Sequence, residues 1–391
     1  MSLQLIWADL CFRARQPGLW KRTELSEVTV APIEEMLMRW AGGSIWRGGP
    51  QCPPQQRCVA LDHYRGAEAV GEPAQQQDWE TWPVHNNRLF WCGPICDHFG
   101  HQLGEFGGRV LLSSLDPCAG SLLFLHQDPA AEWWTLKPWQ RDWIDYLNPS
   151  RKPVVISAGG FRARQLVVIP QQQRLGEPPT QAHLAALTRH SRMLDGPVIH
   201  EPVVLSRSRH APADSQPGMR GSFAGEQAFD ACMAARGARI VYPETLALRE
   251  LLELLHRATC LVVSEGSVLH AMELLGHQPQ KRVVVMARRP LWPGMERPLR
   301  CRFPQLQWID AVKELVWCEP SNPRVKGVGR LNWEAALSQL GQTLQWSFSQ
   351  ADVDRLERAS DKQLVALSEH VALQRKRCGP EDRRQRRAGG W

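Results

Sequence analysis

Two arginines directly follow a short apolar segment in the second half of the chain, and their spacing suits the binding of an anion. The segment at residues 203–205 runs into Ser206-Arg207-Ser208-Arg209-His210. An arginine at the carboxyl end of a buried parallel strand can hold a diphosphate with two N–H donors at once. For either Arg207 or Arg209 alone, a solvated surface role is the alternative.

A second candidate for contacting a phosphate or a ribose is the segment Val263-Ser264-Glu265-Gly266-Ser267-Val268-Leu269-His270. Its small residues predict a tight turn from a strand into a helix that starts at Gly266. The first N–H groups of a helix and the positive end of its dipole attract anions. The alternative is that Gly266 and Ser267 only allow close packing and cap the helix.

A third group of residues, in the first half, could move a proton. A helix predicted at about 99–115 places His101, Glu105 and Arg109 four residues apart on one face. A histidine with a carboxylate one turn away can be held in the tautomer that accepts a proton from a hydroxyl. Asp97 is a second candidate for this base. The alternative is a row of side chains that only solvates the helix.

The same region offers a metal hypothesis, because it contains four residue types that bind zinc, at Cys92, Cys96, His98 and His101. Structural zinc sites usually separate their two ligand pairs by more residues, and Cys92 is predicted to lie in a strand. We therefore favour the proton-transfer interpretation of His101.

The elements around the first two groups alternate regularly. Strands are predicted at 203–206, 239–242, 261–263 and 283–285, with helices at 222–236, from 243 onward and at 266–275. Ser222 is predicted to cap the first of these helices, and Gly237 to end it. Apolar strands that alternate with helices predict a parallel, doubly wound sheet, which binds ligands at the carboxyl ends of its strands.

The first half has the same character from residue 88, whereas residues 1–87 are rich in turn formers and lack a clear period. Strands are predicted at 89–92, 122–125, 153–157 and 165–169, and a further helix at 139–147. Two late helices are predicted at 333–344 and 352–373.

Charge and composition narrow the function classes. The net charge is +7, but residues 375–391 hold seven basic and two acidic residues, so the rest of the chain is nearly balanced. This argues against a nucleic-acid partner and predicts a solvated basic tail that can touch an anionic membrane surface. No signal peptide or membrane span is predicted, and the 11 cysteines fit reduced thiols in the cytoplasm.

Taken in order, these residues make the chain resemble glycosyltransferase family 61, especially its bacterial members of capsular polysaccharide biosynthesis. The matching positions are Trp91-Cys92-Gly93, Gly100-His101 with Glu105 and Arg109, Ser206-Arg207, Arg220 with Glu226, Val241-Tyr242-Pro243-Glu244, and Glu265-Gly266-Ser267-Val268-Leu269-His270. The resemblance covers about residues 88 to 290. Two features depart from it: Gly225 stands where the family has Asn, and the Gly-Ala-Gly-Leu-Thr-Asn motif of plant and animal members is absent.

The resemblance implies an inverting transferase of GT-B type, with two Rossmann-like, doubly wound parallel-sheet domains that face a cleft. It implies a nucleotide-diphosphate sugar as donor, carrying a hexose or a pentose, and a glycan or surface polysaccharide as acceptor. The donor would be bound by Arg207, Arg209, Arg220, Glu226, Ser264, Glu265, Gly266, Ser267 and His270. The base would be His101 supported by Glu105, with Asp97 second and Arg109 as a further candidate. No cofactor and no metal are expected.

The expected organisation has five parts. An N-terminal region at 1–87 precedes an acceptor-side α/β lobe at 88–175 and a nucleotide-sugar lobe at 176–330, followed by helices at 331–373 and the basic disordered tail at 374–391. The enzyme is expected in the cytoplasm, at most peripheral to the inner face of the membrane. The alternatives are a catalytically degenerate transferase fold that serves as an assembly partner, and a zinc-containing nucleic-acid-binding protein.

Overall fold

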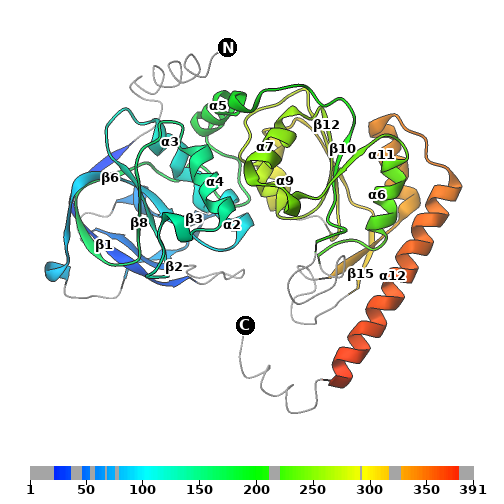
Figure 1. The fold of residues 1–391 in the computed structure, drawn as a ribbon, viewed down its shortest axis with the longest axis horizontal. Helices are drawn as coiled ribbons and strands as arrows, with labels where there is room; N and C mark the ends of the chain where they lie inside the picture. The colour runs from blue at the N-terminus through cyan, green and yellow to red at the C-terminus, as the bar shows by residue number, and fades with distance from the viewer. Residues whose placement is uncertain are drawn as a thin grey trace.

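The computed structural model describes residues 22–36, 46–52, 58–66, 68–74, 79–210, 221–290, 293–316 and 327–377. Within them the chain is a mixed α/β protein with a seven-stranded sheet in its first half and a five-stranded sheet in its second half (Figure 1). Arg220 and most of the predicted basic tail lie outside the described residues.

The seven-stranded sheet has the order β5-β2-β1-β9-β6-β7-β8. Its parallel part consists of β6 (Val84–Pro94), β7 (Ser121–Leu125), β8 (Val154–Ser157) and β9 (Phe161–Val168). The long strand β1 (Thr23–Met36) pairs antiparallel with β9 and with β2 (Trp46–Gln51), and β2 pairs with the short β5 (Gly71–Glu72). The expectation of a purely parallel first sheet is therefore wrong.

The upstream strands were missed because β1 is irregular. Val28 and Val30 alternate toward the core, but Pro32 interrupts the pattern and the register with β2 shifts between Ala31 and Glu35. Residue 88, where the sequence predicts the first lobe to begin, lies inside β6.

The five-stranded sheet is parallel throughout, as predicted. Its order is β11-β10-β12-β13-β14, formed by β10 (Val203–Leu205), β11 (Arg239–Val241), β12 (Cys260–Ser264), β13 (Arg282–Met286) and β14 (Gln305–Ile309). From β10 the chain goes first to β11 on one side of it and later to β12 on the other side. The carboxyl ends of β10 and β12 therefore flank the point at which such sheets bind ligands.

Helices α6 (Glu226–Ala234), α7 (Leu248–Arg257), α8 (Val268–Met272) and α9 (Pro293–Arg300) connect these strands. Two details differ from the prediction. Ser222 does not cap α6, which starts after Gly225 at a φ of +83°, and α8 is shorter than the predicted helix at 266–275. Gly237 follows α6 with a φ of +85°, in the left-handed region, and ends the helical segment as expected.

The helix predicted at 99–115 is broken into three pieces, α2 (Phe99–Gly104), the 3-10 helix η4 (Phe106–Arg109) and α3 (Val110–Leu115). The break falls at Glu105, whose φ of −127° is not helical, and at the Gly107-Gly108 pair that follows it. His101 and Arg109 therefore do not share one straight helix face.

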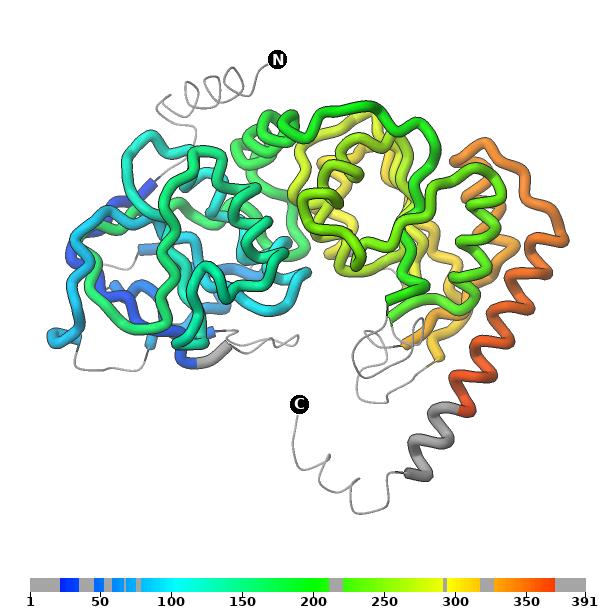
Figure 2. The backbone as a smooth tube through the Cα atoms, in the orientation of Figure 1, coloured from blue at the N-terminus to red at the C-terminus, as the bar shows by residue number. Residues whose placement is uncertain are grey.

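Helices from both halves meet in a single apolar layer between the two sheets. This layer contains α4 (Pro138–Leu147) from the first half and α5 (Gln181–His190) from the segment that connects the two halves. It also contains α7 and α8 from the second half. The Tyr146 hydroxyl of α4 donates to the Leu274 carbonyl at 3.2 Å across this layer. Figure 2 shows the chain passing from the first half to the second through α5.

A second apolar cluster lies on the opposite side of the parallel sheet. There α11 (Trp333–Leu344) and the long α12 (Gln350–Arg377) pack near α6, with Trp333 stacked on Phe229. The remaining described elements are β3 (Tyr64–Arg65), β4 (Glu68–Ala69), β15 (Val312–Val316), β16 (Val328–Leu331), η2 (Val59–Leu61), η3 (Trp79–Thr81), η5 (Trp133–Thr135), η6 (Ser191–Leu194) and η7 (Pro243–Thr245).

Two further observations concern the whole of the described chain. Each described helix is either too short or too polar to cross a lipid bilayer. The described cysteines, which include the buried Cys92, Cys232 and Cys260, are free thiols.

Candidate functional site

The turn after β10 is fixed by a buried carboxylate. Asp230 on α6 accepts hydrogen bonds from the hydroxyls of Ser206, at 2.7 Å, and Ser208, at 2.6 Å, and the Ser208 N–H donates to the Ser206 hydroxyl. Burial raises the pKa of Asp230 above its usual value, while the two hydroxyls act in the opposite direction. These bonds hold the backbone on both sides of Arg207.

Arg207 lies over the turn that follows β12, which unites the first two groups singled out in the sequence. Its Nε donates to the Gly221 carbonyl at 3.0 Å. A Cβ atom added at Gly266 would lie 2.3 Å from Nη1 of Arg207, so only glycine leaves room for the guanidinium there. Burial lowers the pKa of Arg207, but an arginine keeps its charge at neutral pH.

Glu226 and Ser264 connect these two turns from inside the protein. One oxygen of the Glu226 carboxyl accepts from the Ser264 hydroxyl at 2.5 Å and from the Arg207 N–H at 2.7 Å. Burial raises the pKa of Glu226 to about 7, against the lowering effect of these two hydrogen bonds. Glu226 is 2% exposed, so it supports Arg207 from behind.

Gly225, the departure from the family pattern, has a packing explanation. Its N–H donates to Gln363 Oε1 at 2.8 Å, and a Cβ atom there would lie 2.5 Å from the Ser360 hydroxyl. Both partners belong to α12. Since α12 occupies the space that a larger side chain would need, glycine at 225 follows from the packing of this C-terminal helix.

Glu265 pairs with an arginine that the sequence analysis did not single out. Arg289 Nε donates to Glu265 Oε1 at 2.5 Å, and the Arg288 N–H donates to the other oxygen at 3.3 Å. Arg288 and Arg289 follow β13 closely, as Arg207 follows β10. The same signal, a basic residue just after an apolar strand, was therefore present in the sequence.

Of the three further predicted donor-binding residues, the structure describes two, Arg209 and His270. Arg209 is exposed and its guanidinium lies 4.1 Å from the centre of the Tyr242 ring, and Arg220 lies outside the described residues. His270 bonds through Nδ1 to Glu273 at 2.6 Å. A Cβ atom added at Gly104 of α2 would lie 2.4 Å from Nδ1 of His270, so this histidine packs between the two halves.

His101 and Glu105 form the expected pair, inside a larger buried cluster. His101 Nδ1 lies 2.8 Å from Glu105 Oε2, and the two side chains are 3% and 0% exposed. Arg65 donates to both oxygens of Glu105, at 2.9 and 3.1 Å, and His63 Nε2 lies 3.3 Å from Oε1. Burial alone would raise the pKa of Glu105, but the bonds from His101, His63 and Arg65 hold it well below the usual range.

His63 and Arg65 come from a region for which the sequence predicted no structure. They lie more than 30 residues before Glu105 in the sequence, and they reach it only because the fold places them next to α2. No spacing in the sequence could have indicated these contacts.

The other two predicted residues of this group have structural roles. Arg109 donates to the carbonyls of Ala60, Leu61 and Asp62, so it holds the end of η2 in place. Asp97 is 68% exposed and forms an ion pair with Lys137 at 3.0 Å. The expectation that Arg109 continues the His101 and Glu105 face is therefore wrong.

His98 caps α2, because its Nδ1 accepts from the His101 N–H at 3.3 Å. Burial lowers its pKa to about 4, helped by the charges of His101 and His270. Burial also raises the pKa of Cys92 and of Cys96 to about 12, which disfavours the thiolates that zinc needs. Among the described residues no group of three or more His, Cys, Asp or Glu side chains could hold a metal ion.

A pocket of about 360 Å³ lies between the two halves, at the carboxyl ends of β10 and β12. From the first half it is lined by Phe99 and Trp139, whose rings meet edge to face at 5.2 Å between centroids. From the second half it is lined by Arg207, His210, Pro243, Glu244, Leu246, Leu248, Leu251, Ser267 and Val268. One arginine in a mostly apolar pocket suits an organic anion that carries a ring.

No protein-family model and no curated protein matches the chain. Among solved structures, the chain is similar to the crystal structure of the glycosyl transferase family 9 from Veillonella parvula DSM 2008. The two are 9% identical and superpose with a TM-score of 0.24, and the match covers 74% of this chain and 97% of that chain. A likeness this low shows neither the family nor the activity of this chain.

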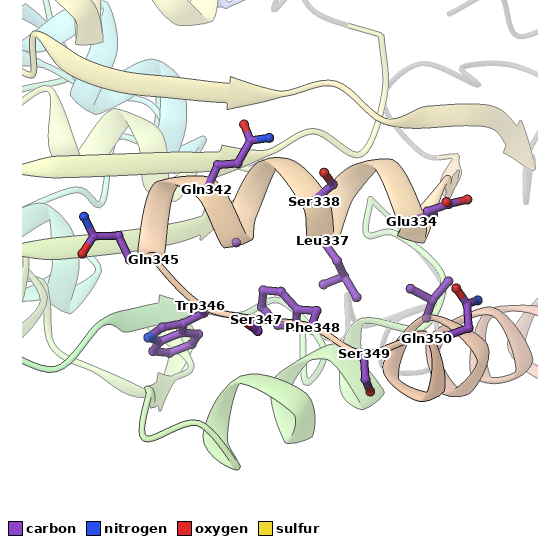
Figure 3. Close-up of a pocket in the computed structure, with 12 residues that line it drawn as sticks. Glu334, Leu337, Ser338, Gln342, Gln345, Trp346, Ser347, Phe348, Ser349 and Gln350 are labelled. Carbon is purple, nitrogen blue, oxygen red and sulfur yellow. The ribbon is translucent and has the colours of Figure 1, made fainter.

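A second pocket, of about 500 Å³, lies between α11 and the beginning of α12. In Figure 3 Leu337 of α11 points toward the segment that carries Phe348, across this pocket. None of the residues singled out in the sequence lines it, so it is separate from the pocket at the strand ends.

Proposed function

We propose that the protein is a glycosyltransferase that moves a sugar, with inversion, from a nucleotide-diphosphate sugar to a hydroxyl of a glycan or surface polysaccharide. The observation that carries this proposal is the pocket at the carboxyl ends of β10 and β12, where Arg207 faces aromatic side chains of the other half. Parallel sheets bind nucleotides at such ends, and the pocket has contributions from both halves, as a transfer between two substrates requires.

Arg207 is the proposed ligand of the diphosphate. Its side chain is fixed over Gly266, and its backbone is fixed by Glu226 and Asp230, so little conformational freedom is lost when an anion binds. Phe99 and Trp139 offer aromatic faces to a ring of the donor, and Glu244 offers a carboxylate to its hydroxyls.

His101 is the proposed base for the acceptor hydroxyl. In the tautomer whose Nδ1–H donates to Glu105, the lone pair is on Nε2 and can accept a proton. Glu105 stays ionised, because its hydrogen bonds from Arg65 and both histidines lower its pKa, and it stabilises the imidazolium that forms. Phe99, two residues before His101, lines the pocket.

The departing diphosphate is proposed to be stabilised by arginine without a metal ion. Loss of transfer on chelation, with recovery on addition of manganese, would contradict this part of the mechanism. We further propose that the enzyme acts in the cytoplasm, and that the basic residues 375–391 bring it to the anionic inner face of the membrane.

The test starts with thermal-shift measurements against sugar nucleotides of UDP, GDP, CMP and dTDP. A ligand at 100 times its dissociation constant stabilises a protein by about 2.7 kcal/mol, which such a scan detects. Hydrolysis and transfer are then assayed with the donor that binds.

Three variants separate donor binding from sugar transfer in this test. Arg207→Ala is expected to abolish donor binding, and His101→Ala to abolish transfer while donor binding is kept. Arg249→Ala on α7, which removes a partly exposed arginine paired with Glu253, serves as the matched control. If no nucleotide binds the wild-type protein, the transferase proposal fails and a scaffold role for this fold is favoured.

A further inference from the structure

His210 leaves the same turn as Arg207 and lines the same pocket. The His210 N–H donates to the Arg207 carbonyl at 2.9 Å, which closes residues 207–210 into a β-turn shortly after β10. Both side chains line the pocket of about 360 Å³ at the strand ends. An imidazole and a guanidinium therefore lie together on this part of the pocket wall.

The Arg207 side chain has N–H groups left for a ligand. Its Nε donates to the Gly221 carbonyl at 3.0 Å, whereas the Glu226 carboxylate accepts from the backbone N–H of Arg207. Among the described residues, no carboxylate forms an ion pair with Arg207, and its two terminal nitrogens have no hydrogen-bond partner. The terminal nitrogens of a guanidinium can contact one anion together.

The His210 ring also has no hydrogen-bond partner within the part of the chain that the structure describes. The residue is half-buried, and burial, followed by the charge of Arg207, lowers the pKa of His210 to about 4. The imidazole is therefore uncharged at neutral pH in this structure, and one of its nitrogens can still accept a proton.

The charged groups around His210 come from three elements. The turn after β10 carries Arg207 and Arg209, α6 carries Glu226 and Asp230, and the turn after β11 carries Glu244. Of these, only the charge of Arg207 affects the pKa of His210. An anion that binds to Arg207 adds negative charge next to the imidazole, and an opposite charge within about 4–6 Å shifts a pKa by about 1 to 3. Binding of an anion therefore favours the protonated ring, which donates from both nitrogens.

We propose that His210 and Arg207 together bind the diphosphate group, and that His210 takes up a proton from the solvent as the anion binds. The proton bonds to the free nitrogen of the imidazole, so the neutral ring becomes an imidazolium that donates to the anion. His210 is then the second cation of the site, in place of Arg209, whose guanidinium lies 4.1 Å from the centre of the Tyr242 ring. Assigning the anion to a sugar nucleotide rests on the proposed function, whereas the proton-coupled anion site does not.

The experiment measures binding of inorganic pyrophosphate by isothermal titration calorimetry at about pH 6 and constant ionic strength, in several buffers with different enthalpies of ionisation. The slope of the measured enthalpy against the buffer enthalpy gives the number of protons taken up. The wild type is expected to take up about 0.1 to 0.9 proton per anion more than His210→Gln, which corresponds to a pKa rise of about 1 to 3. The ionisation of pyrophosphate itself is the same for both proteins and cancels in this difference.

The affinity for pyrophosphate gives a second measurement. His210→Gln and His210→Ala are expected to weaken binding by about 10-fold at about pH 6, and by a smaller factor at about pH 8, where the imidazole stays neutral. His200→Gln is the matched control, because His200 is exposed and precedes β10, at the opposite end of the strand from the pocket. It is expected to bind pyrophosphate and to take up protons as the wild type does.

Thermal melts separate a binding defect from a folding defect, and His210→Gln remains informative if His210→Ala does not fold. Equal proton uptake by the wild type and His210→Gln, or no pyrophosphate binding by the wild type, would overturn the inference. If the uptake depends on His210 and no sugar nucleotide is turned over, the anion site stands and the transferase proposal fails. If sugar is transferred and the uptake does not depend on His210, the transferase proposal stands and the proton-coupled site fails.

Discussion

Replacing Glu105 with Gln tests the cluster on which the proposed base depends. The carboxylate is fully buried and receives two hydrogen bonds from Arg65, one from His101 and a longer one from His63. Glutamine has nearly the same shape, but it has one acceptor oxygen, and its NH₂ group must face a donor. The Arg65 guanidinium then loses its counter-charge.

The expected loss of stability follows from these contacts. Removing one partner of a buried ion pair typically costs about 3–5 kcal/mol, because a charge is left without compensation. The Arg65 side chain is 17% exposed, so water can solvate part of its charge. We therefore expect a loss near the lower end, about 3 kcal/mol, for Glu105→Gln near pH 7.

The pH dependence provides a second and more specific signature. The pKa of Glu105 is lowered in the folded state from an ordinary value of 4.5. Its contribution is therefore complete above about pH 4.5 and is lost as the pH falls further, toward the folded-state pKa. Equilibrium unfolding in urea, followed by circular dichroism, should show a difference between wild type and variant that is constant from about pH 6 to 8 and shrinks below about pH 4.5.

Glu253→Gln is the matched control, because Glu253 is 37% exposed and pairs with Arg249 on the helix surface. It is expected to change stability by less than about 0.5 kcal/mol. A Glu105→Gln variant as stable as the control, or a difference that does not change between about pH 7 and pH 3.5, would refute the role assigned to this carboxylate.

Three other substitutions have defined outcomes in urea unfolding. Glu226→Gln should be more stable than the wild type by an amount that grows as the pH rises from about 4.5 to about 7, because burial raises the pKa of Glu226; an equal gain at every pH would contradict this. Gly104→Ala places a methyl group 2.4 Å from a nitrogen of His270 and should cost about 1–3 kcal/mol, whereas an unchanged midpoint would mean that His270 moves freely aside. Ser360→Ala removes the acceptor of the buried Trp333 N–H, at 2.7 Å, and should cost about 1–3 kcal/mol, so a neutral result would place that N–H in contact with water.

The regular part of the fold could be predicted because its signals are local. Val203 to Leu205 and Cys260 to Ser264 are buried throughout, so their apolar runs indicated parallel strands directly. The order of the five strands then brings the turns after β10 and β12 together, and the expected proximity of Arg207 and Gly266 is confirmed. The His101 and Glu105 contact was also predictable from helical spacing.

What could not be predicted depends on distant segments or on small breaks in regularity. The turn at Glu105 interrupts a helical pattern that continues past it, and it sends Arg109 to the carbonyls of residues 60–62. His63 and Arg65 reach Glu105 from a region without periodicity. Arg289 has the same local signal as Arg207, a basic residue just after an apolar strand, but its contact with Glu265 joins two turns that are 24 residues apart in the sequence.

The packing of His270 against α2 limits how this protein could be recombined with a relative. Gly100 and Gly104 of α2 leave space for the imidazole of His270. Glu273, which belongs to the same half as His270, bonds to its ring. A chimera that joined the first sheet of one homologue to the second sheet of another would have to inherit the two glycines and the histidine as a matched set. We therefore expect the two halves to be inherited together in evolution. A library of shuffled homologues should yield folded proteins only from combinations that keep both glycines and the histidine.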